Sequence, residues 1–386
     1  MKLIEVISPE TQKEFLLFPV RLYKNEKNWI RPLDKDINEV FDPEKNKFFR
    51  HGEICRWLLQ DDKGQTIGRV AAFINKKTAK ATKYVTGGMG FFECINDQSA
   101  ANALLDQCKK WLEERGMECM EGPINFGERM KWWGLLVDGF VEPNYCTPYN
   151  FAYYQKLLET YGFQEYFKQF TFHRLVSDPL PALYADKADR IARDPRYTFE
   201  SIKKSKLEKF AEDFKEIYNK AWGKHTGVAE ITSAIALTQM KQMKPVMDED
   251  LVWFAYHDGK PVAFFIMIPE LNQLFKHMDG QFNWFAKLKF LYHKMTGSCK
   301  KMFGVVFGIV PEFQGKGLEG AIVTAAAKRI QPMGRYTEFE MNWIGDFNPK
   351  MMHICEQVGG KIVKTHITYR VNFDPSKEHF RHPVIE

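Results

Sequence analysis

The pattern of apolar and polar residues along the chain predicts strands and helices in alternation. Apolar residues recur three or four positions apart through residues 100–115, 150–161 and 206–221, which is the spacing of an amphipathic helix. A continuous apolar run at residues 302–310 is typical of a buried strand, and residues 318–330 follow it as a further helix. This order of elements predicts an α/β protein with a mixed sheet and helices on both of its faces.

The second half of the chain repeats the first at a nearly constant spacing. Each half contains a hairpin in which a glycine turn joins two apolar strands, and a later helix that ends at a glycine before a closing strand. Three pairs of landmarks recur at offsets of 195 to 197 residues: Gly64 with Gly259, Gly162 with Gly359, and Arg174 with Arg370. A constant offset predicts two copies of one fold. We expect an N-terminal domain at 1–180, a proline-punctuated linker at 181–197 and a C-terminal domain at 198–386.

Composition and charge narrow the class of protein. Of the 386 residues, 45% are hydrophobic, 27% are charged and 32 are Phe, which predicts a globular chain with large cores. The sequence has neither an apolar run long enough to span a membrane nor the apolar region of a signal peptide, and we therefore expect a cytoplasmic protein. A net charge of +6 admits an anionic ligand or a membrane surface and argues against nucleic acid as a partner. The seven cysteines form no CxxC pair, so we expect reduced thiols and no metal site.

A glycine-rich segment stands where the strand at 302–310 gives way to the helix at 318–330. It reads Pro311-Glu-Phe-Gln-Gly-Lys-Gly317. Glycines let the backbone turn tightly, so that successive N–H groups and the positive end of the helix dipole can face one anion, such as a pyrophosphate. The same segment is also compatible with an ordinary strand-to-helix turn that binds nothing.

These residues carry a resemblance to a known family. The segment is similar to the acyl-CoA-binding loop of the GNAT superfamily of N-acyltransferases, whose pattern is V-x-P-x-x-[QR]-x-x-G-x-[GA]. Ile309, Pro311, Gln314 and Gly317 take matching positions, whereas Glu319 replaces the final Gly or Ala and is expected to repel a phosphate. The resemblance implies that acyl-CoA or acetyl-CoA binds as co-substrate and that no metal is needed. The residues implied in binding it are Ile309, Val310, Gln314, Gly315, Lys316, Gly317 and Leu318.

Two further stretches extend the resemblance to most of the chain. The segment 348–359 resembles the family's N-x-x-A-x-x-x-Y-x-x-x-G helix, with Cys355 where many members have a tyrosine that acts as general acid; we expect a buried structural thiol there. The first copy keeps the order of elements but lacks the glycine loop. With the stretch 29–32 and the aromatic segment 143–154, it resembles a bacterial group of tandem GNAT-like proteins that includes ceramide synthases, which N-acylate a sphingoid base.

Candidate catalytic residues lie on the strand after the expected acyl-CoA helix. Glu338, Glu340 and Asn342 alternate along this strand and therefore share one face. Amide formation needs a proton acceptor within reach of the amine, for which Glu340 is our first choice and Asp346 the second. The expected catalytic set is Glu340, Asp346 and Asn348, and the expected substrate-binding set is Asn125, Tyr145, Tyr149, Asn150 and Tyr154. Solvent-facing carboxylates, core aromatics and a water relay with no dedicated base are the alternatives.

An insert of roughly thirty residues separates the second hairpin from the strand at 302–310. Six of its apolar residues fall at helical spacing: Trp284, Phe285, Leu288, Leu291, Tyr292 and Met295. Lysines and a histidine occupy other positions, and a basic amphipathic helix with Trp and Phe on its apolar side is typical of a membrane interface. That interpretation places the protein peripherally at the inner face of the membrane. The other interpretation is a helix packed over the sheet, with the lysines as a solvated face.

The resemblance implies an acyl-CoA-dependent N-acyltransferase acting on a primary amine, for which we consider a long-chain, sphingoid-type amine. Two other classes are compatible with the sequence. One is a degenerate GNAT-like protein that holds acyl-CoA or a lipid without turnover, which Glu319 and the missing tyrosine favour. The other is an aminoacyl-tRNA-dependent transferase of the tandem Fem-like kind, which the near-balanced charge disfavours because such a protein needs a strongly basic groove. The acceptor amine, the acyl length, the carrier (CoA or acyl carrier protein) and the oligomeric state stay open.

Overall fold

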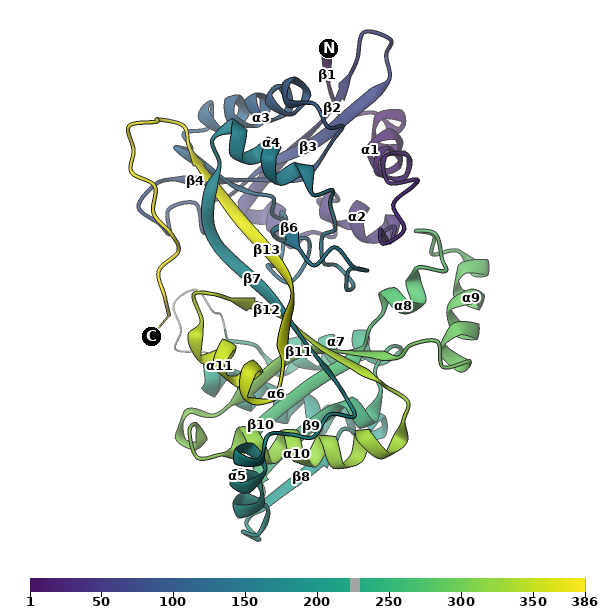
Figure 1. The fold of residues 1–386 in the computed structure, drawn as a ribbon, viewed down its shortest axis with the longest axis vertical. Coiled ribbons are helices and arrows are strands. Elements are labelled where there is room, and N and C mark those ends of the chain that lie inside the picture. Colours follow the sequence, from purple (N-terminus) through teal and green to yellow (C-terminus); the bar gives the residue numbers. More distant parts are fainter. Residues whose placement is uncertain (223–229, 386) are drawn as a thin grey trace.

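The computed structural model describes residues 1–222 and 230–385, which form two α/β halves joined by a single sheet (Figure 1). The first half contains, in chain order, β1 (Lys2–Glu5), α1 (Pro9–Leu22), α2 (Asp34–Val40), β2 (Gly52–Gln60), β3 (Thr66–Asn75), β4 (Thr86–Cys94), α3 (Gln98–Glu113), β5 (Cys119–Gly122), β6 (Leu135–Asp138), α4 (Tyr153–Tyr161) and β7 (Gln164–Leu175).

Helix α5 (Ala182–Ala192) follows in the linker, and the second half then repeats the same succession. It contains β8 (Tyr197–Ser201), α6 (Leu207–Trp222), α7 (Ser233–Met243), β9 (Val252–His257), β10 (Lys260–Pro269), α8 (Asn272–Phe275), α9 (Trp284–Met295), β11 (Lys301–Ile309), α10 (Leu318–Ile330), β12 (Glu338–Gly345), α11 (Pro349–Gln357) and β13 (Lys361–Asn372). In both halves a strand, two helices and a hairpin precede strand, helix, strand, helix and closing strand. This order confirms the predicted tandem α/β fold.

Local sequence signals account for several of these boundaries. The helix expected at 150–161 ends where Gly162 adopts φ +113°, a left-handed conformation that glycine accepts at a helix end. In the insert, the Asn283 side chain accepts the backbone N–H of Ala286 and so caps α9, which has the bounds expected from its apolar spacing. The predicted helix at 318–330 likewise forms α10 with unchanged bounds.

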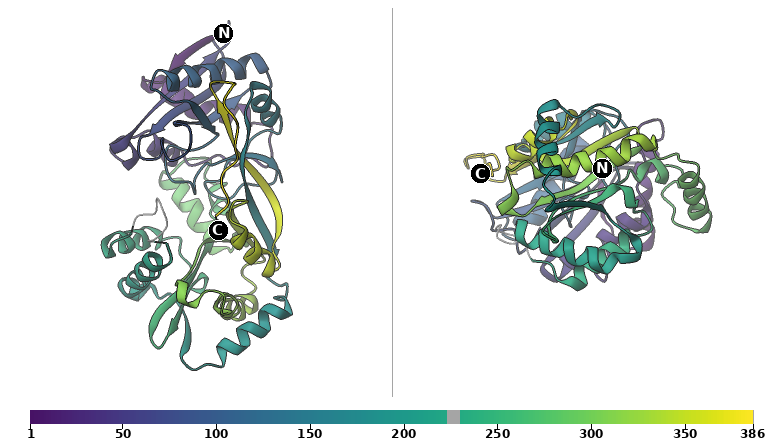
Figure 2. Two further views of the ribbon diagram at one scale, coloured as in Figure 1. Left: turned by 90° about the vertical axis from the view of Figure 1, so that its left-hand side faces the viewer. Right: turned by 90° about the horizontal axis from the view of Figure 1, so that it is seen from below.

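Within the described residues the sheet has thirteen strands, and the two halves exchange their closing strands. Along the sheet the order is β1-β2-β3-β4-β5-β13-β7-β12-β11-β10-β9-β8, with β6 pairing to β13 beside this path. Strand β13 of the second half thus pairs with β5 of the first half, and β7 of the first half pairs with β12 of the second. Figure 2 shows these two long antiparallel strands running between the halves. The predicted domain division at 181–197 stays a prediction. It separates the two copies of the sequence repeat, but it does not separate the two packed halves, because each half contains the last strand of the other.

The two arginines found as repeat landmarks hold the exchanged strands in place. Arg370, on β13, is fully buried and forms an ion pair with Glu121 on β5 of the first half. Arg174, on β7, donates to the backbone carbonyl of Val358 in the second half. Each arginine therefore fastens its strand to the opposite half of the molecule.

Helices cover the sheet through continuous apolar stripes. On α3, Leu104 and Leu112 are fully buried against β2–β4, and Gly68 of β3 makes room for Leu104, whose Cδ1 would lie 2.6 Å from a Cβ there. Helix α10 packs in the same way against β10–β12, while α6 and α7 cover β9 and β10 through residues such as Phe210. Truncating a leucine such as Leu104 to alanine is expected to destabilise the fold by about 2–5 kcal/mol.

Diverging parallel strands create an opening in each half. Strands β11 and β12 pair only between Lys301–Gly304 and Glu338–Met341. Beyond this point β11 continues to Ile309, whereas β12 turns towards β7 through a bulge that contains Trp343, at φ +62°. Strands β4 and β5 of the first half diverge in the same way after Gly88. Openings between diverging strands are where α/β folds bind ligands.

Candidate active site

An apolar cavity of about 270 Å³ fills the opening between β11 and β12. The two diverging strands and the helices α10 and α11 form its walls, with Val306, Phe307, Ala327, Met341, Trp343 and Ile354 among the lining residues. Asn342 and Arg174 add polar groups to a lining that is otherwise dominated by apolar side chains. A pocket with this composition suits a ligand with a long apolar segment and a few polar atoms.

The glycine-rich loop connects β11 to α10, which both line this cavity. Gly315 (φ +70°) and Gly317 (φ +92°) adopt left-handed conformations, which explains why glycine is needed at these two positions. The Gln314 side chain braces the loop by donating from Nε2 to the carbonyl of Ile309 at 3.0 Å. The Gly315 N–H donates to the Glu319 carboxylate at 3.1 Å. Glu319 thus occupies a backbone donor that a bound phosphate would need.

The residues predicted to bind acyl-CoA divide into two groups. Ile309, Val310, Gly317 and Leu318 are buried where β11 meets α10, and Gln314, Gly315 and Lys316 are exposed. The buried group shapes the turn, and the exposed group carries the polar atoms that a phosphate can reach. Binding of acyl-CoA by these residues stays a prediction.

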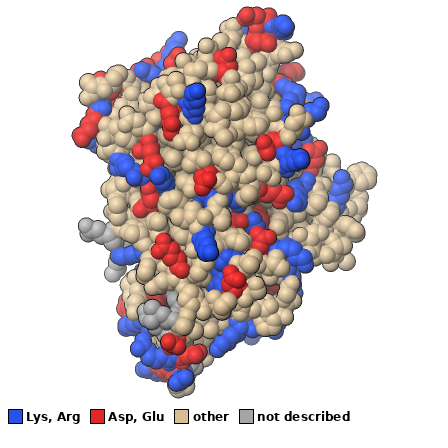
Figure 3. Space-filling model, viewed as in Figure 1, with Lys and Arg blue, Asp and Glu red and all other residues tan. Residues whose placement is uncertain are grey.

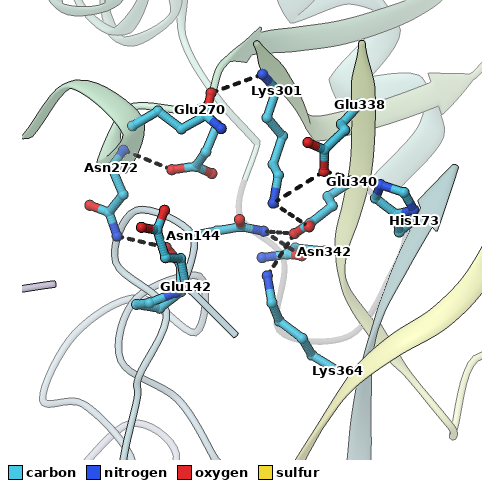
Figure 4. A network of polar contacts seen from close by, with 12 residues as sticks. Glu142, Asn144, His173, Glu270, Asn272, Lys301, Glu338, Glu340, Asn342 and Lys364 are labelled. Carbon is cyan, nitrogen blue, oxygen red and sulfur yellow. Dashed lines mark hydrogen bonds and ion pairs between the residues drawn. The ribbon is translucent and has the colours of Figure 1, made fainter. Parts of the chain in front are cut away.

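A network of buried polar side chains lies at the point where β11 and β12 part (Figure 4). Its centre is Glu340, which is 2% exposed and bonds to Lys301 Nζ at 2.5 Å and Lys364 Nζ at 2.8 Å. Burial acts to raise the pKa of Glu340, but the two lysines outweigh it and lower the pKa to about 2. Glu340 therefore stays charged at neutral pH and holds the two lysines, and its role as the proton acceptor stays a prediction.

Glu270 is a second buried carboxylate beside this network, and its electrostatic environment is the opposite. It follows β10, and its Oε1 accepts the backbone N–H groups of Tyr145 and Asn272, each at 2.8 Å. Burial raises the pKa of Glu270 to about 7, because these hydrogen bonds and the nearby Lys364 offset only part of the desolvation. A carboxylate with this pKa can take up and release a proton at physiological pH, as a general base must.

Asn144 connects the parts of the network. Its Nδ2 donates to Glu340 at 2.6 Å and to Asn342 Oδ1 at 3.1 Å, and the next residue, Tyr145, donates its N–H to Glu270. The Oδ1 atom of Asn144 is buried and accepts no hydrogen bond from the described residues. An acceptor left unpaired in this way is unfavourable, so a ligand N–H placed there would be stabilised.

A second cavity, of about 110 Å³, lies in the first half beside the end of β4. Four of the five predicted substrate-binding residues line it: Tyr145, Tyr149, Asn150 and Tyr154. The Tyr154 hydroxyl donates to Glu93 at 2.9 Å, and the Tyr145 hydroxyl donates to Asp36 at 2.7 Å. Asn150 bonds to both the N–H and the carbonyl of Leu136, so its amide holds β6 in place.

The polar network is hydrogen-bonded to lining residues of both cavities. Asn342 lines the first cavity, and Tyr145 and Asn272, whose N–H groups bind Glu270, line the second. Glu270, Glu340, Lys301 and Lys364 themselves line neither cavity.

The other predicted residues lie outside this arrangement. Asn125 is buried but lines neither cavity, Asp346 forms an ion pair with Arg381, and Asn348 caps α11 by accepting the N–H of Met351 at 3.2 Å. Catalytic roles for Asp346 and Asn348 stay predictions that no contact in the network supports. Cys355 lines the first cavity, and burial raises its pKa to about 12, so the thiol is protonated at neutral pH.

Sequence reasoning missed four members of the network: Asn144, Glu270, Lys301 and Lys364. The available signals were an acid directly after the apolar strand Lys260–Pro269 and a lysine at the start of the apolar run of β11. Neither signal is specific, because charged residues often end strands. Within residues 1–222 and 230–385, no group of three or more His, Cys, Asp or Glu side chains is arranged to hold a metal ion.

The comparisons with known proteins cover 92% or more of the chain. No protein-family model matches the sequence. The sequence is 26% identical over 375 residues to a protein named bacterial ceramide synthase from Caulobacter vibrioides (strain NA1000 / CB15N). The aligned region covers 96% of this chain and 97% of that protein. It is 24% identical over 363 residues to Protein YghO of Escherichia coli (strain K12), with 92% of each chain covered. The resemblance therefore involves both halves.

Solved structures share the tandem architecture. A tandem GNAT protein from the clavulanic acid biosynthesis pathway superposes with a TM-score of 0.55 at 9% identity, covering 97% of this chain and 99% of that one. A GCN5-related glucosamine N-acetyltransferase region in a fungal multi-domain β-N-acetylglucosaminidase gives a TM-score of 0.54 at 12% identity and covers 96% of this chain, which spans only 38% of that longer protein. The chain thus has the tandem GNAT fold, and its similarities support an acyltransferase. Within that class it resembles the bacterial ceramide synthase-type proteins.

Proposed function

We propose that the protein is an acyl-CoA-dependent N-acyltransferase that moves an acyl group from a CoA thioester to a primary amine. The observation that carries this proposal is the apolar cavity between β11 and β12, whose walls include the two elements, β11 and α10, that the glycine loop joins. In this proposal the loop holds the pyrophosphate, and the acyl end of the molecule lies in the cavity. The apolar lining favours an acyl chain longer than acetyl.

Binding of CoA requires a local rearrangement at the loop. The Gly315 N–H is held by Glu319, so a phosphate must displace this carboxylate before it can accept the same donor. The exposed Lys316 next to it offers a compensating positive charge. Glu319 therefore competes with the pyrophosphate and sets the affinity of the loop for CoA.

The chemistry that we propose is direct transfer. An acceptor that enters as an ammonium ion first releases one proton to solvent, which leaves a neutral amine. The amine nitrogen then attacks the thioester carbonyl carbon, the C–N bond forms, and the C–S bond breaks as CoA leaves. The proton that the amine loses passes to Glu270, whose pKa of about 7 suits this role, and then to the CoA thiolate, so that the protons balance. Asn144 Oδ1, which is buried without a partner among the described residues, accepts an N–H of the amine. Glu340 keeps Lys301 and Lys364 in place.

The acceptor in this proposal is a long-chain amine of the sphingoid type. The name of the Caulobacter relative, bacterial ceramide synthase, supports such an acceptor. We assign its amino end to the second cavity, where Tyr145, Tyr149 and Tyr154 supply aromatic and hydroxyl groups beside the acids Asp36 and Glu93. A primary ammonium group enters such a site favourably, because the acids and the aromatic faces attract a cation.

Two further parts of the proposal follow from a lipid acceptor. A long-chain amine resides in a membrane, so the exposed helix α9 (Trp284–Met295) is proposed to contact the membrane surface, with the protein placed peripherally at the cytoplasmic face. Nucleic acid is not a partner in this proposal.

The test combines a turnover assay with a variant that fills the first cavity. Free CoA thiol is measured with long-chain acyl-CoA and either a sphingoid-type amine or a short amine. Ala327→Phe adds a ring to the cavity wall, whereas Ala234→Phe adds the same ring on the exposed surface of α7. We expect at least a tenfold loss of turnover in Ala327→Phe and no change in Ala234→Phe. Equal turnover in both variants would remove the acyl chain from this cavity.

A second candidate function has two specific observations in its favour. Because Glu319 occupies the Gly315 donor and Cys355 stands in place of the family tyrosine, the protein is alternatively a binder of acyl-CoA that does not turn it over. Calorimetric binding of acyl-CoA without thiol release, across the full panel of amines, would favour this candidate.

A further inference from the structure

We infer that helix α9 docks onto an anionic lipid surface and holds the mouth of the second cavity at that surface. This inference rests on the proposed function only for the identity of the acceptor. The docking itself follows from three observations: an exposed apolar stripe, its surrounding charge, and the contacts that fix the insert to the rim of the cavity.

The apolar stripe of α9 faces away from the protein. Its six members are exposed to different degrees: Trp284 by 69%, Phe285 by 73%, Leu288 by 46%, Leu291 by 50%, Tyr292 by 64% and Met295 by 78%. On the opposite side, Ala286 is buried and Phe290 lies 5.6 Å from the ring of Phe275, so a different set of residues packs against the protein. The packed-helix interpretation therefore accounts only for this inner side. Large exposed apolar patches mark contact surfaces.

The charge around the stripe complements an anionic surface. From residue 280 to residue 298 the chain has no acidic residue, and Lys287, Lys289 and Lys294 are all exposed. Lys35 of the first half extends this positive edge, because its Nζ lies 4.0 Å from the centre of the Phe282 ring, which is itself exposed. Figure 3 shows the protrusion formed by α9 as a mainly uncharged surface with basic residues beside it. Such a surface attracts anionic lipid headgroups, whereas a neutral apolar partner would gain nothing from the lysines.

The insert is fastened to residues that line the second cavity. The Asp34 N–H donates to the carbonyl of Gly280 at 2.8 Å, and Arg31 forms an ion pair with Asp279 at 3.6 Å. Arg31 and Asp34 both belong to the cavity lining. Docking of α9 therefore fixes the position of this cavity relative to the lipid surface.

The helix lies on the surface and does not cross it. α9 has 12 residues, and none of the helices in the described ranges combines the length and the apolar character that a membrane span requires. Its six apolar side chains insert at the boundary between headgroups and acyl chains, with the lysines at the headgroup level. Figure 1 shows α9 at the edge of the molecule, where a flat surface can reach it.

The experiment is co-sedimentation of the full-length protein with vesicles, in the absence of acyl-CoA and amine. Phosphatidylcholine vesicles with 30% phosphatidylglycerol, about the anionic content that gives a strong surface potential, are compared with phosphatidylcholine alone. The variants are Trp284→Ser with Phe285→Ser, and as a matched control Val384→Ser with Ile385→Ser, a pair of exposed apolar neighbours elsewhere. All four side chains are exposed, and equal melting temperatures of the variants establish that the fold is intact.

We expect the wild type and the control to bind the anionic vesicles and the α9 variant to bind at least tenfold more weakly. Binding of the wild type should fall in high salt because the lysines contribute. Absence of wild-type binding, or equal binding of both variants, overturns the inference. Loss of a dimer in the α9 variant, with no vesicle binding by the wild type, assigns the stripe to a second copy of the chain. Vesicle binding without turnover of any amine overturns the proposed function alone, and turnover of a detergent-dispersed amine without vesicle binding overturns the docking alone.

Discussion

Glu270 offers the sharpest test of the proposed site, because its buried carboxylate is expected to lower stability and to support turnover. The folded-state pKa of about 7 lies above the ordinary value of 4.5. Below pH 4.5 the carboxyl group is protonated in both the folded and the unfolded state and has no effect on the balance. As the pH rises to 7, the unfolded chain releases the proton more readily, so the free energy of unfolding falls. Above pH 7 the full penalty is about 3 kcal/mol.

The perturbation is Glu270→Gln. Two backbone N–H groups bind the side chain, and both donate to Oε1. Glutamine retains this oxygen, so the substitution removes the charge and keeps these hydrogen bonds. Urea unfolding at pH 8 should therefore show a gain in stability of up to about 3 kcal/mol, and at pH 5 a gain of less than about 1 kcal/mol. Release of CoA thiol at pH 8 should fall by at least tenfold, because the proton acceptor is gone; general-base groups typically contribute about 10²–10⁴-fold.

The matched control is Glu356→Gln, at an exposed carboxylate on α11, which should leave both measurements unchanged. The electrostatic reasoning would be refuted if Glu270→Gln were less stable than the wild type at pH 8. It would also be refuted if the substitution changed the free energy of unfolding by the same amount at pH 5 and at pH 8. If stability rises as expected but turnover is unchanged, Glu270 destabilises the fold without taking part in the reaction. Water would then be the group that accepts the proton from the amine.

Three other predictions address the loop and the network. Glu319→Ala should bind CoA about twofold to fivefold more tightly by calorimetry, since a competing negative charge near the helix N-terminus is removed; weaker binding would mean that Glu319 supports the loop. Lys364→Met should lower the free energy of unfolding by about 3 kcal/mol in urea titrations, because Glu340 keeps only Lys301 as its cation. An unchanged free energy of unfolding would mean that water replaces the lysine. The depressed pKa of Glu340 should contribute about 3 kcal/mol of stability above pH 4.5, lost as the pH falls to about 2, and an acid titration of Glu340→Gln should lack this step.

Local sequence signals were sufficient for several of the elements and for the tandem fold. Apolar spacing identified α9 and α10 with their final bounds, and the glycine at 162 marked a helix end because only a left-handed residue fits there. The constant offset between Arg174 and Arg370 marked equivalent strands. It did not reveal which half each strand joins, because a strand presents the same apolar alternation to its own half and to the other.

The site was predictable only in part, for the same reason. Period-two alternation placed Glu340 and Asn342 on one face, and both indeed contact Asn144. The sequence could not show that Lys301 and Lys364, from two other strands, would surround Glu340 and lower its pKa. Glu270 is defined by burial and by the N–H groups of residues distant in the chain, which no local pattern encodes.

The exchange of closing strands also determines when the first half can be completed during synthesis. Strand β5 ends at Gly122, and the strand that pairs with it, β13, extends to Asn372. At a translation rate of about 5–20 residues per second, roughly 10 to 50 s pass between the emergence of these two strands. During this interval the nascent first half presents an open sheet edge, with its own closing strand present but destined for the other half. A ribosome-bound chain that stops before β13 should therefore be the stage at which this protein most needs a chaperone.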